Sequence, residues 1–154
     1  NDLDKWIISK LVLLQQDVEQ AMKDYNLVKA TRPIFDFVDG LSTWYIRRSR
    51  ARFKAGDQQA VDTLAFVLKE LAKMVAPFSP MTAETIYQEF NNEQESVHLE
   101  LWTSLDKKLV DKKVLDNMDV VKEIAETIHA IRAKEGLKVR QPLKELQLKT
   151  ELKL

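Results

Sequence analysis

The sequence predicts an all-α protein, an antiparallel bundle of four to five helices with a short, strand-like C-terminal tail. The composition points this way, because 45% of the residues are hydrophobic and 31% are charged, with only three glycines and four prolines among 154 residues. Such a composition disfavours both a disordered chain and a turn-rich β-barrel. Apolar residues also recur every three or four positions over long stretches, which is the spacing of amphipathic helices.

The first helix is expected over Leu3–Asp24, a stretch without glycine or proline. Its apolar residues follow one another at steps of three or four, so they share one helix face. They are Leu3, Ile7, Leu11, Leu14, Val18, Ala21 and Tyr25. Asp2 precedes this run and is the predicted N-cap, because its short side chain can accept a hydrogen bond from the first free amides.

A second long helix is expected over Leu27–Lys54. Pro33 falls inside it, and a proline in a helix interior costs about 3 kcal/mol because it removes one hydrogen bond and clashes with the preceding turn. We therefore predict a kink or a restart near Ala30–Arg32. Phe35 and Phe37 add a second apolar edge, so we expect this helix to be central and the most buried of all.

Two shorter helices are predicted next. One runs over Gln58–Ala76, with Asp57 as its cap and Pro77 as its end. Ser79 and Pro80 then resemble an N-cap followed by a proline at the first helical position. The expected inner face of the first of these helices is Val61, Leu64, Leu68, Leu71 and Val75, and that of the second is Ala83, Ile86, Tyr87 and Phe90.

The last third of the chain is less regular. Asn91–Val114 has no sustained period and is interpreted as a wrapping loop. Apolar residues spaced over Leu115–Ile131 then predict a last long helix, and Gly136 suits its left-handed C-terminal stop. Beyond it, Lys144–Leu154 alternates apolar with polar side chains, which predicts an amphipathic strand.

A lone strand has an unpaired edge, so we expect this tail to begin a further subdomain. The predicted organisation is a helical bundle over residues 1–136, followed by the start of a truncated C-terminal subdomain over residues 137–154. The chain opens on Asn1 rather than on methionine, which suggests a segment of a longer protein.

Several classes of chemistry are disfavoured by composition. The chain has no cysteine and two histidines, and neither His98 nor His129 has an acidic residue at metal-motif spacing, so we expect no metal site. No glycine-rich phosphate loop and no serine nucleophile motif occurs, so we expect no catalytic residues and no cofactor in this segment. No apolar run is long enough for a membrane span, and we expect a soluble, cytoplasmic protein.

The densest charged feature lies between Trp44 and Lys54. Five basic side chains occupy eight positions there without an acid, namely Arg47, Arg48, Arg50, Arg52 and Lys54. Because the 24 basic and 24 acidic residues of the chain cancel, this cluster is a local excess of positive charge. Guanidinium groups bind phosphate oxygens in a bidentate manner, so the cluster resembles a nucleic-acid footprint.

Helical spacing divides this cluster between two faces. Arg47, Arg50 and Lys54 lie on one side, and we expect them to face RNA. Arg48 and Arg52 lie on another side and are weaker candidates. The alternative is that these arginines pair with the many carboxylates of the bundle.

A second basic stretch surrounds the predicted helix end at Gly136. It consists of Arg132, Lys134, Lys138 and Arg140. Of these, we expect Arg132, Lys138 and Arg140 to contact RNA. The helix dipole favours cations at a helix C-terminus, so ordinary charge enrichment is the alternative interpretation.

Five segments stand out as motifs: Leu3–Leu11 (LDKWIISKL), Trp44–Arg50 (WYIRRSR), Ala76–Glu84 (APFSPMTAE), Ser96–Leu99 (SVHL) and Lys138–Leu143 (KVRQPL). Together, and in this order, they resemble the anticodon-binding region of isoleucyl-tRNA synthetases, a family of class I enzymes. Valyl and leucyl relatives share the opening helix and the Ala-Pro-Phe-x-Pro turn. The second and fifth segments together favour the isoleucine family.

The resemblance implies a noncatalytic domain that binds the anticodon stem-loop of the isoleucine tRNA, within a ligase that attaches isoleucine to that tRNA using ATP. ATP and magnesium would act in the catalytic domain. The implied partners are the isoleucine tRNA and the catalytic and C-terminal domains of the same chain. Two alternatives stay open: the same domain of a valyl or other class I relative, and a helical bundle that binds proteins instead of RNA.

Overall fold

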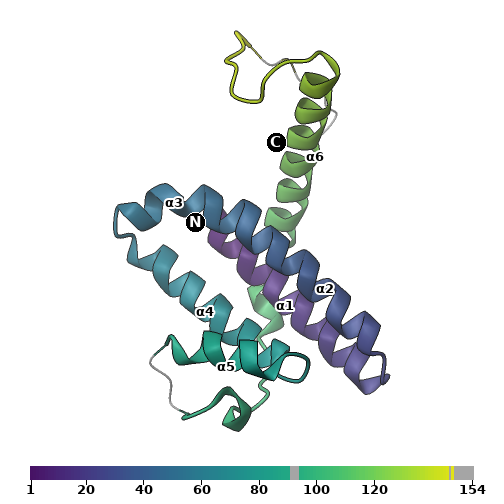
Figure 1. The fold of residues 1–154 in the computed structure, drawn as a ribbon, viewed down its shortest axis with the longest axis vertical. Coiled ribbons are helices and arrows are strands. Elements are labelled where there is room, and N and C mark those ends of the chain that lie inside the picture. The colour runs from purple at the N-terminus through teal and green to yellow at the C-terminus, as the bar shows by residue number, and fades with distance from the viewer. Residues whose placement is uncertain (91–93, 146, 148–154) are drawn as a thin grey trace. The chain divides into compact units, whose positions relative to one another are not determined.

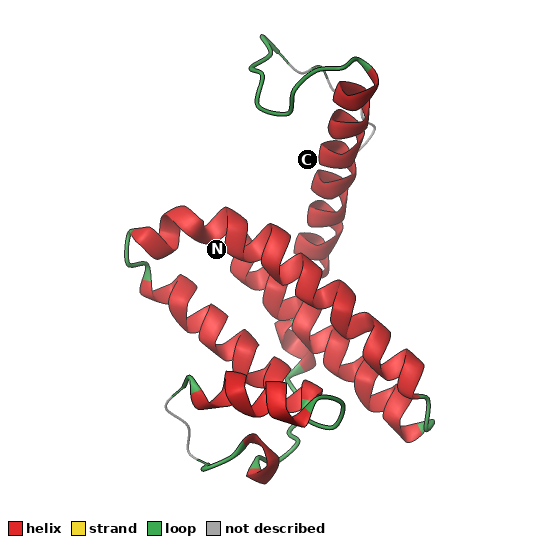
Figure 2. Cartoon of the chain, in the orientation of Figure 1, coloured by secondary structure: helices red, strands yellow, loops and turns green. Residues whose placement is uncertain are grey.

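The computed structural model describes residues 1–90, 94–145 and 147, and these residues contain helices and loops but no strand (Figures 1 and 2). The predicted all-α class is confirmed. The helices are α1 (Asp2–Lys23), α2 (Leu27–Gly40), η1 (Leu41–Ile46), α3 (Arg47–Lys54), α4 (Gln58–Val75), α5 (Pro80–Gln88), η2 (Val97–Leu99), η3 (Lys107–Leu109) and α6 (Lys112–Lys134). The chain forms two compact units, Asn1–Lys112 and Lys113–Leu154.

Helix α1 is the centre of the first unit, because α2 and α4 both pack against it. Its predicted boundaries are confirmed to within one residue at each end. The N-cap is Asn1 and not Asp2, since the Asn1 side chain accepts a hydrogen bond from the Leu3 N–H at 3.0 Å. The apolar residues that α1 buries are Trp6, Ile7, Leu11, Val12, Leu14, Val18 and Ala21.

The predicted restart near Pro33 is wrong, while the kink given as its alternative stays a prediction. Helix α2 begins at Leu27, capped by Asn26, and runs through Pro33 to Gly40 without a restart. Proline removes only the hydrogen bond to the carbonyl of Lys29, four residues back. Lys29 is exposed, so water can bind that carbonyl.

The irregularity of this long helix lies instead in η1, which is a π-helix. The Arg47 N–H donates to the Ser42 carbonyl five residues back, where an α-helix would use the residue four back. The wider turn keeps one continuous inner face, since Leu41, Tyr45 and Ser49 are all buried although they are spaced four apart. In a regular α-helix, steps of four rotate the side chain progressively away from the core.

The prediction that this second helix is the most buried is also wrong. Only one side of α2 is buried, and its buried residues are Ala30, Ile34 and Phe37. Phe35 is 74% exposed and Val38 is 43% exposed. The two phenylalanines therefore point to different sides of the helix, and only Phe37 reaches the core.

Helix α4 has the predicted Asp57 cap, which accepts from the Ala60 N–H at 3.2 Å. Its predicted inner face is wrong, however, since Val61 is 43% exposed and Leu71 alone of the predicted set is fully buried. The observed face is Ala60, Thr63, Val67, Leu71, Ala72 and Met74. Apolar residues cover more than one side of α4, so periodicity alone did not select the side that packs.

Helix α5 and the following segment complete the first unit. Ala83 and Tyr87 are buried as predicted and pack with Ala72 and Val97 in a small core. The predicted wrapping loop contains the short 3₁₀ turns η2 and η3, and side chains of α1 hold the loop in place. Gln15 donates to the Thr103 carbonyl at 3.0 Å and accepts from the Leu105 N–H at 2.6 Å. 

The second unit comprises α6 and the residues that follow. Helix α6 starts two residues before the predicted loop ends, and none of its side chains is fully buried. Gly136 has a φ of +65°, and the Leu137 N–H donates to the Arg132 carbonyl, so the predicted left-handed stop is confirmed. The predicted strand over Lys144–Leu154 lies largely outside the described residues, and the domain boundary at residue 136 stays a prediction. No helix in the described part of the chain is long and apolar enough to cross a membrane.

Candidate nucleic-acid interface

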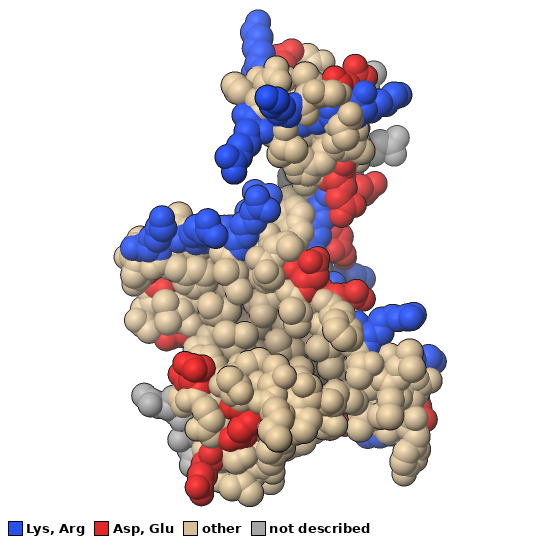
Figure 3. All heavy atoms as spheres, in the orientation of Figure 1, with Lys and Arg blue, Asp and Glu red and all other residues tan. Residues whose placement is uncertain are grey.

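Helix α3 presents four exposed basic side chains, which we call the α3 basic surface: Arg47, Arg48, Arg50 and Lys54. In the space-filling view, a band of basic side chains follows α3, and acidic side chains gather separately toward α5 (Figure 3). Within the described residues, none of the four forms a salt bridge. Their positive charge is therefore available to an external polyanion.

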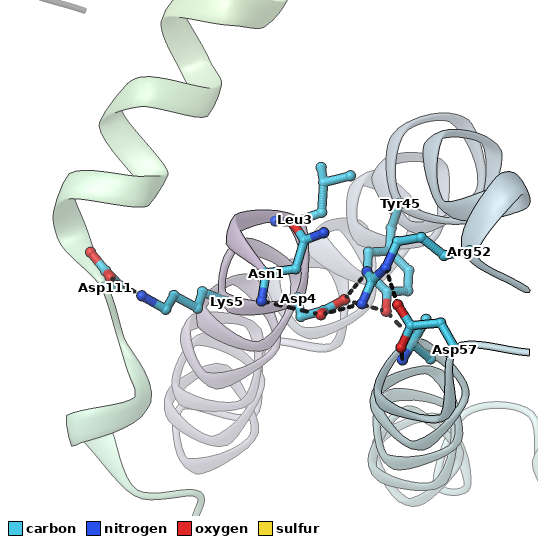
Figure 4. A network of polar contacts seen from close by, with 9 residues as sticks. Asn1, Leu3, Asp4, Lys5, Tyr45, Arg52, Asp57 and Asp111 are labelled. Atoms are coloured by element: carbon cyan, nitrogen blue, oxygen red, sulfur yellow. Dashed lines mark hydrogen bonds and ion pairs between the residues drawn. The ribbon is translucent and has the colours of Figure 1, made fainter. Parts of the chain in front are cut away.

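Arg52, the fifth cation of the cluster, points inward. Its Nη1 and Nη2 atoms lie 2.7 and 2.8 Å from the two carboxylate oxygens of Asp4, and its Nε lies 2.7 Å from Asp57 (Figure 4). The Tyr45 hydroxyl donates to the same Asp4 carboxylate at 2.9 Å. The guanidinium is thus engaged on all three nitrogens, so we leave Arg52 out of the RNA-facing set.

The electrostatics of this network follow from its burial. Asp4 is 3% exposed, and desolvation alone would raise the pKa of its carboxyl. The hydrogen bonds from Arg52 and Tyr45 outweigh that effect and hold the pKa below its ordinary value. Burial and the neighbouring Asp4 charge raise the pKa of the Tyr45 hydroxyl. The network therefore consists of a carboxylate, a guanidinium and a neutral phenol at neutral pH.

This network fixes the orientation of α3. Asp4 belongs to α1, Tyr45 to η1, Arg52 to α3, and Asp57 is the cap of α4. Three helices are thus joined through one guanidinium on the inner side of α3. The α3 basic surface lies on the remaining sides of that helix.

Arg48 has a different neighbour. Its guanidinium carbon lies over the ring of Trp44, 5.1 Å from the ring centroid, within the distance of a cation–π contact. Trp44 is half-buried and Arg48 is exposed. The pair therefore places an aromatic ring and a cation side by side at the N-terminal end of the α3 basic surface.

The second basic stretch lies in the second unit. Arg132 uses Nη1 to donate to the carbonyls of Lys138 and Gln141, each at 2.9 Å, so it braces the turn after α6. Lys138 and Arg140 are exposed. Two of the three predicted RNA contacts therefore remain open, and the third has a structural role in the turn.

Two acidic residues near α5, Glu84 and Glu100, have partners within the first unit. Glu84 accepts from the Ser96 hydroxyl at 2.9 Å and from the Val97 N–H at 3.0 Å, and hydrogen bonds from Gln88 and Ser96 lower its carboxyl pKa. Burial, together with the carboxylate of Glu100, raises the pKa of Tyr87 to about 12.

Among the described residues, no group of three or more His, Asp or Glu side chains is arranged to hold a metal ion.

Sequence reasoning missed the partner of Arg52. Asp4 lies 48 positions away in the chain, and no local pattern connects the two residues. A signal did exist for Asp57, because a basic residue that directly precedes a turn can reach the carboxylate that caps the next helix. The sequence placed Asp57 at the cap without pairing it with Arg52.

A helical domain with a fixed, exposed basic helix is the kind of scaffold that binds a folded polyanion. The family described as the anticodon-binding domain of tRNA ligase matches residues 4–148, and the chain belongs to this family.

Within this family, the chain is similar to isoleucine–tRNA ligases. It is 39% identical over 153 residues to isoleucine–tRNA ligase of Porphyromonas gingivalis, 42% identical over 153 residues to that of Protochlamydia amoebophila, and 38% identical over 146 residues to that of Streptomyces avermitilis. These alignments cover 96%, 95% and 92% of this chain, and 14%, 15% and 14% of the respective relatives. The chain thus spans about one seventh of the length of these curated relatives.

Proposed function

We propose that this chain binds the anticodon stem-loop of the isoleucine tRNA as a noncatalytic domain of an isoleucine–tRNA ligase. That ligase attaches isoleucine to its tRNA using ATP. The observation that supports the proposal best is the α3 basic surface, whose four cations have no acidic partner among the described residues. Family membership and the identity of the relatives point to the same ligand.

The chemistry of RNA recognition fits this surface. Cations bind the phosphate backbone and release its counterions, while unpaired loop bases are free to contact side chains. Because the Arg52 network holds α3 on its inner side, the cations start from a fixed helix and lose less conformational freedom on binding than cations of a flexible loop. Lys138 and Arg140 are proposed as further contacts to the same RNA.

We assign the chemical steps of the reaction to other domains of the ligase. We place ATP and magnesium in the catalytic domain of the same chain, because the sequence here has no phosphate-cradling loop. The proposed partners are the isoleucine tRNA and the catalytic and C-terminal domains. As for other tRNA ligases, the proposed compartment is the cytoplasm.

A salt titration tests this function. If Arg47, Arg50 and Lys54 each neutralise one phosphate, the logarithm of the binding constant for isoleucine tRNA should fall against the logarithm of salt concentration with a slope of about −2 to −3 or steeper. Valine tRNA, measured in parallel, tests the neighbouring assignment to a valyl relative. A flat titration, or no binding at low salt, would contradict RNA binding and favour a protein-interaction bundle.

A further inference from the structure

The Trp44–Arg48 pair differs from the other cations of α3. Within the described part of the chain, Arg47, Arg50 and Lys54 make no ring contact, whereas the Arg48 guanidinium lies over the Trp44 indole. A side chain held against a ring loses part of its freedom before any ligand arrives. Arg48 is therefore arranged for a more specific contact than simple charge neutralisation.

The position of this pair follows from the π-helical turn. Tyr45 and Ser49 are completely buried, and each directly follows a member of the pair. The residues next to buried ones on a helix lie about 100° around its axis, at the boundary between the packed and the open side. Trp44 is accordingly half-buried, while Arg48 next to it is exposed.

A guanidinium supported in this way is a flat cationic surface. Its central carbon lies 5.1 Å from the centroid of the indole, and Arg48 is exposed to solvent. Guanidinium planes and aromatic rings are the surfaces on which unpaired bases stack, and stacking accepts any base because every base has a π-face. A base inside a duplex is already stacked on its neighbours and has no free face to offer.

We propose that the Trp44–Arg48 pair is a stacking platform for one unpaired nucleobase of the RNA loop, while Arg47, Arg50 and Lys54 bind phosphates. This inference rests on the proposed function, since it assigns a separate task within the same surface. Under this proposal, Arg48 binds through the planar shape of its guanidinium group. Arg47, Arg50 and Lys54 bind through their positive charge.

Substitution by lysine distinguishes base stacking from binding through charge alone. Arg48→Lys keeps the positive charge and removes the planar guanidinium. Arg32→Lys is the matched control, because Arg32 is an exposed arginine of α2, outside the α3 basic surface. Neither side chain is in the core, so both variants should melt at the wild-type temperature.

The probes are an RNA hairpin with the anticodon stem-loop sequence of the isoleucine tRNA and a fully paired duplex with the same stem, each measured with the 154-residue chain. Arg48→Lys should weaken binding of the hairpin about 5- to 150-fold, the range that stacking of one base contributes. Binding of the duplex should change less than about twofold, as should binding of either RNA by Arg32→Lys. The salt slope of Arg48→Lys should equal that of the wild type, because the charge is kept.

Two results would overturn the platform while leaving RNA binding by α3 intact. One is wild-type affinity of Arg48→Lys for the hairpin, and the other is an equal loss on hairpin and duplex. If the wild-type chain binds neither RNA at low salt, the platform and the proposed function fail together.

Discussion

The Arg52 network makes a quantitative prediction about stability. Replacing Arg52 with alanine removes two short hydrogen bonds to Asp4, at 2.7 and 2.8 Å, and one to Asp57. The Asp4 carboxylate then stays buried without its main donor. We expect Arg52→Ala to be among the most destabilising single substitutions on the long helix that runs from α2 to α3.

The magnitude follows from the burial of the two partners. Removing one member of a buried ion pair costs about 3 to 5 kcal/mol, because the other charge is left uncompensated. The Arg52 side chain is 17% exposed and that of Asp4 is 4% exposed, so we take the lower end, about 3 kcal/mol. For a chain of this length, that corresponds to a fall of about 6 to 12 °C in Tm.

The pH dependence gives the prediction a second signature. The Asp4 pKa is lowered in the folded protein, so the stabilisation is fully present above the ordinary aspartate pKa and is lost as pH falls through the lower folded value. In Arg52→Ala, burial instead raises the Asp4 pKa, and protonation relieves the buried charge. The stability difference between the wild type and the variant should therefore shrink as pH falls from 7 to about 3.

Thermal and urea unfolding, followed by circular dichroism, measure both effects. Arg50→Ala is the control, since it removes an arginine from the exposed side of the same helix and should change stability by less than about 0.5 kcal/mol. The reasoning would be refuted if Arg52→Ala were no less stable than Arg50→Ala. A difference that widened in acid would refute the assignment of the effect to Asp4.

Three further predictions concern packing and backbone. Met74→Ala should lower the free energy of unfolding by about 2 to 5 kcal/mol, because Met74 is fully buried. Met81→Ala should leave it nearly unchanged, because Met81 is 82% exposed. Urea unfolding measures both variants. Gly56→Ala should lower the free energy of unfolding by about 1 to 2 kcal/mol, because Gly56 has a φ of +72°. Gly40→Ala should raise it by about 0.5 to 1 kcal/mol, since the new Cβ meets Trp6 at an ordinary contact distance of 3.6 Å. Glu84→Gln should speed amide exchange of the loop that this carboxylate holds, measured by hydrogen exchange.

Each of these predictions has a result that contradicts it. Equal losses at Met74 and Met81 would mean that the packed face of α4 is assigned wrongly. A neutral Gly56→Ala would contradict the left-handed turn before α4. Unchanged exchange in Glu84→Gln would show that other contacts hold the loop.

Local signals in the sequence identified the ends of helices well. Asp57 and Gly136 were recognised because a capping carboxylate and a left-handed glycine act within one turn, so neighbouring residues contain the information. Pro33 shows the limit of such local signals. The cost of proline in a helix is an average, and here Lys29, the residue whose carbonyl loses its donor, is exposed.

The packed faces were harder to predict, because they depend on what lies across the interface. Val61 and Val67 are chemically identical, yet only Val67 is buried, and the choice depends on how α4 meets α1 and α5. The π-turn at η1 has no short motif in the sequence. The division of the basic cluster is similar. Spacing separated Arg52 from Arg47, but the inward direction of Arg52 also depends on Asp4, which lies far away in the sequence.

The central claim is that the exposed cations of α3 bind the RNA, and a double substitution tests it most directly. Arg47→Ala combined with Arg50→Ala, which should leave the fold intact, is compared with Lys29→Ala combined with Lys69→Ala, which removes the same charge outside α3. Affinity for isoleucine tRNA is measured over a range of salt concentrations. The first pair should weaken binding and reduce the salt slope by about 1.5 to 2, and the second pair should change neither. Equal effects of the two pairs, or an unchanged slope in the first, would contradict the claim.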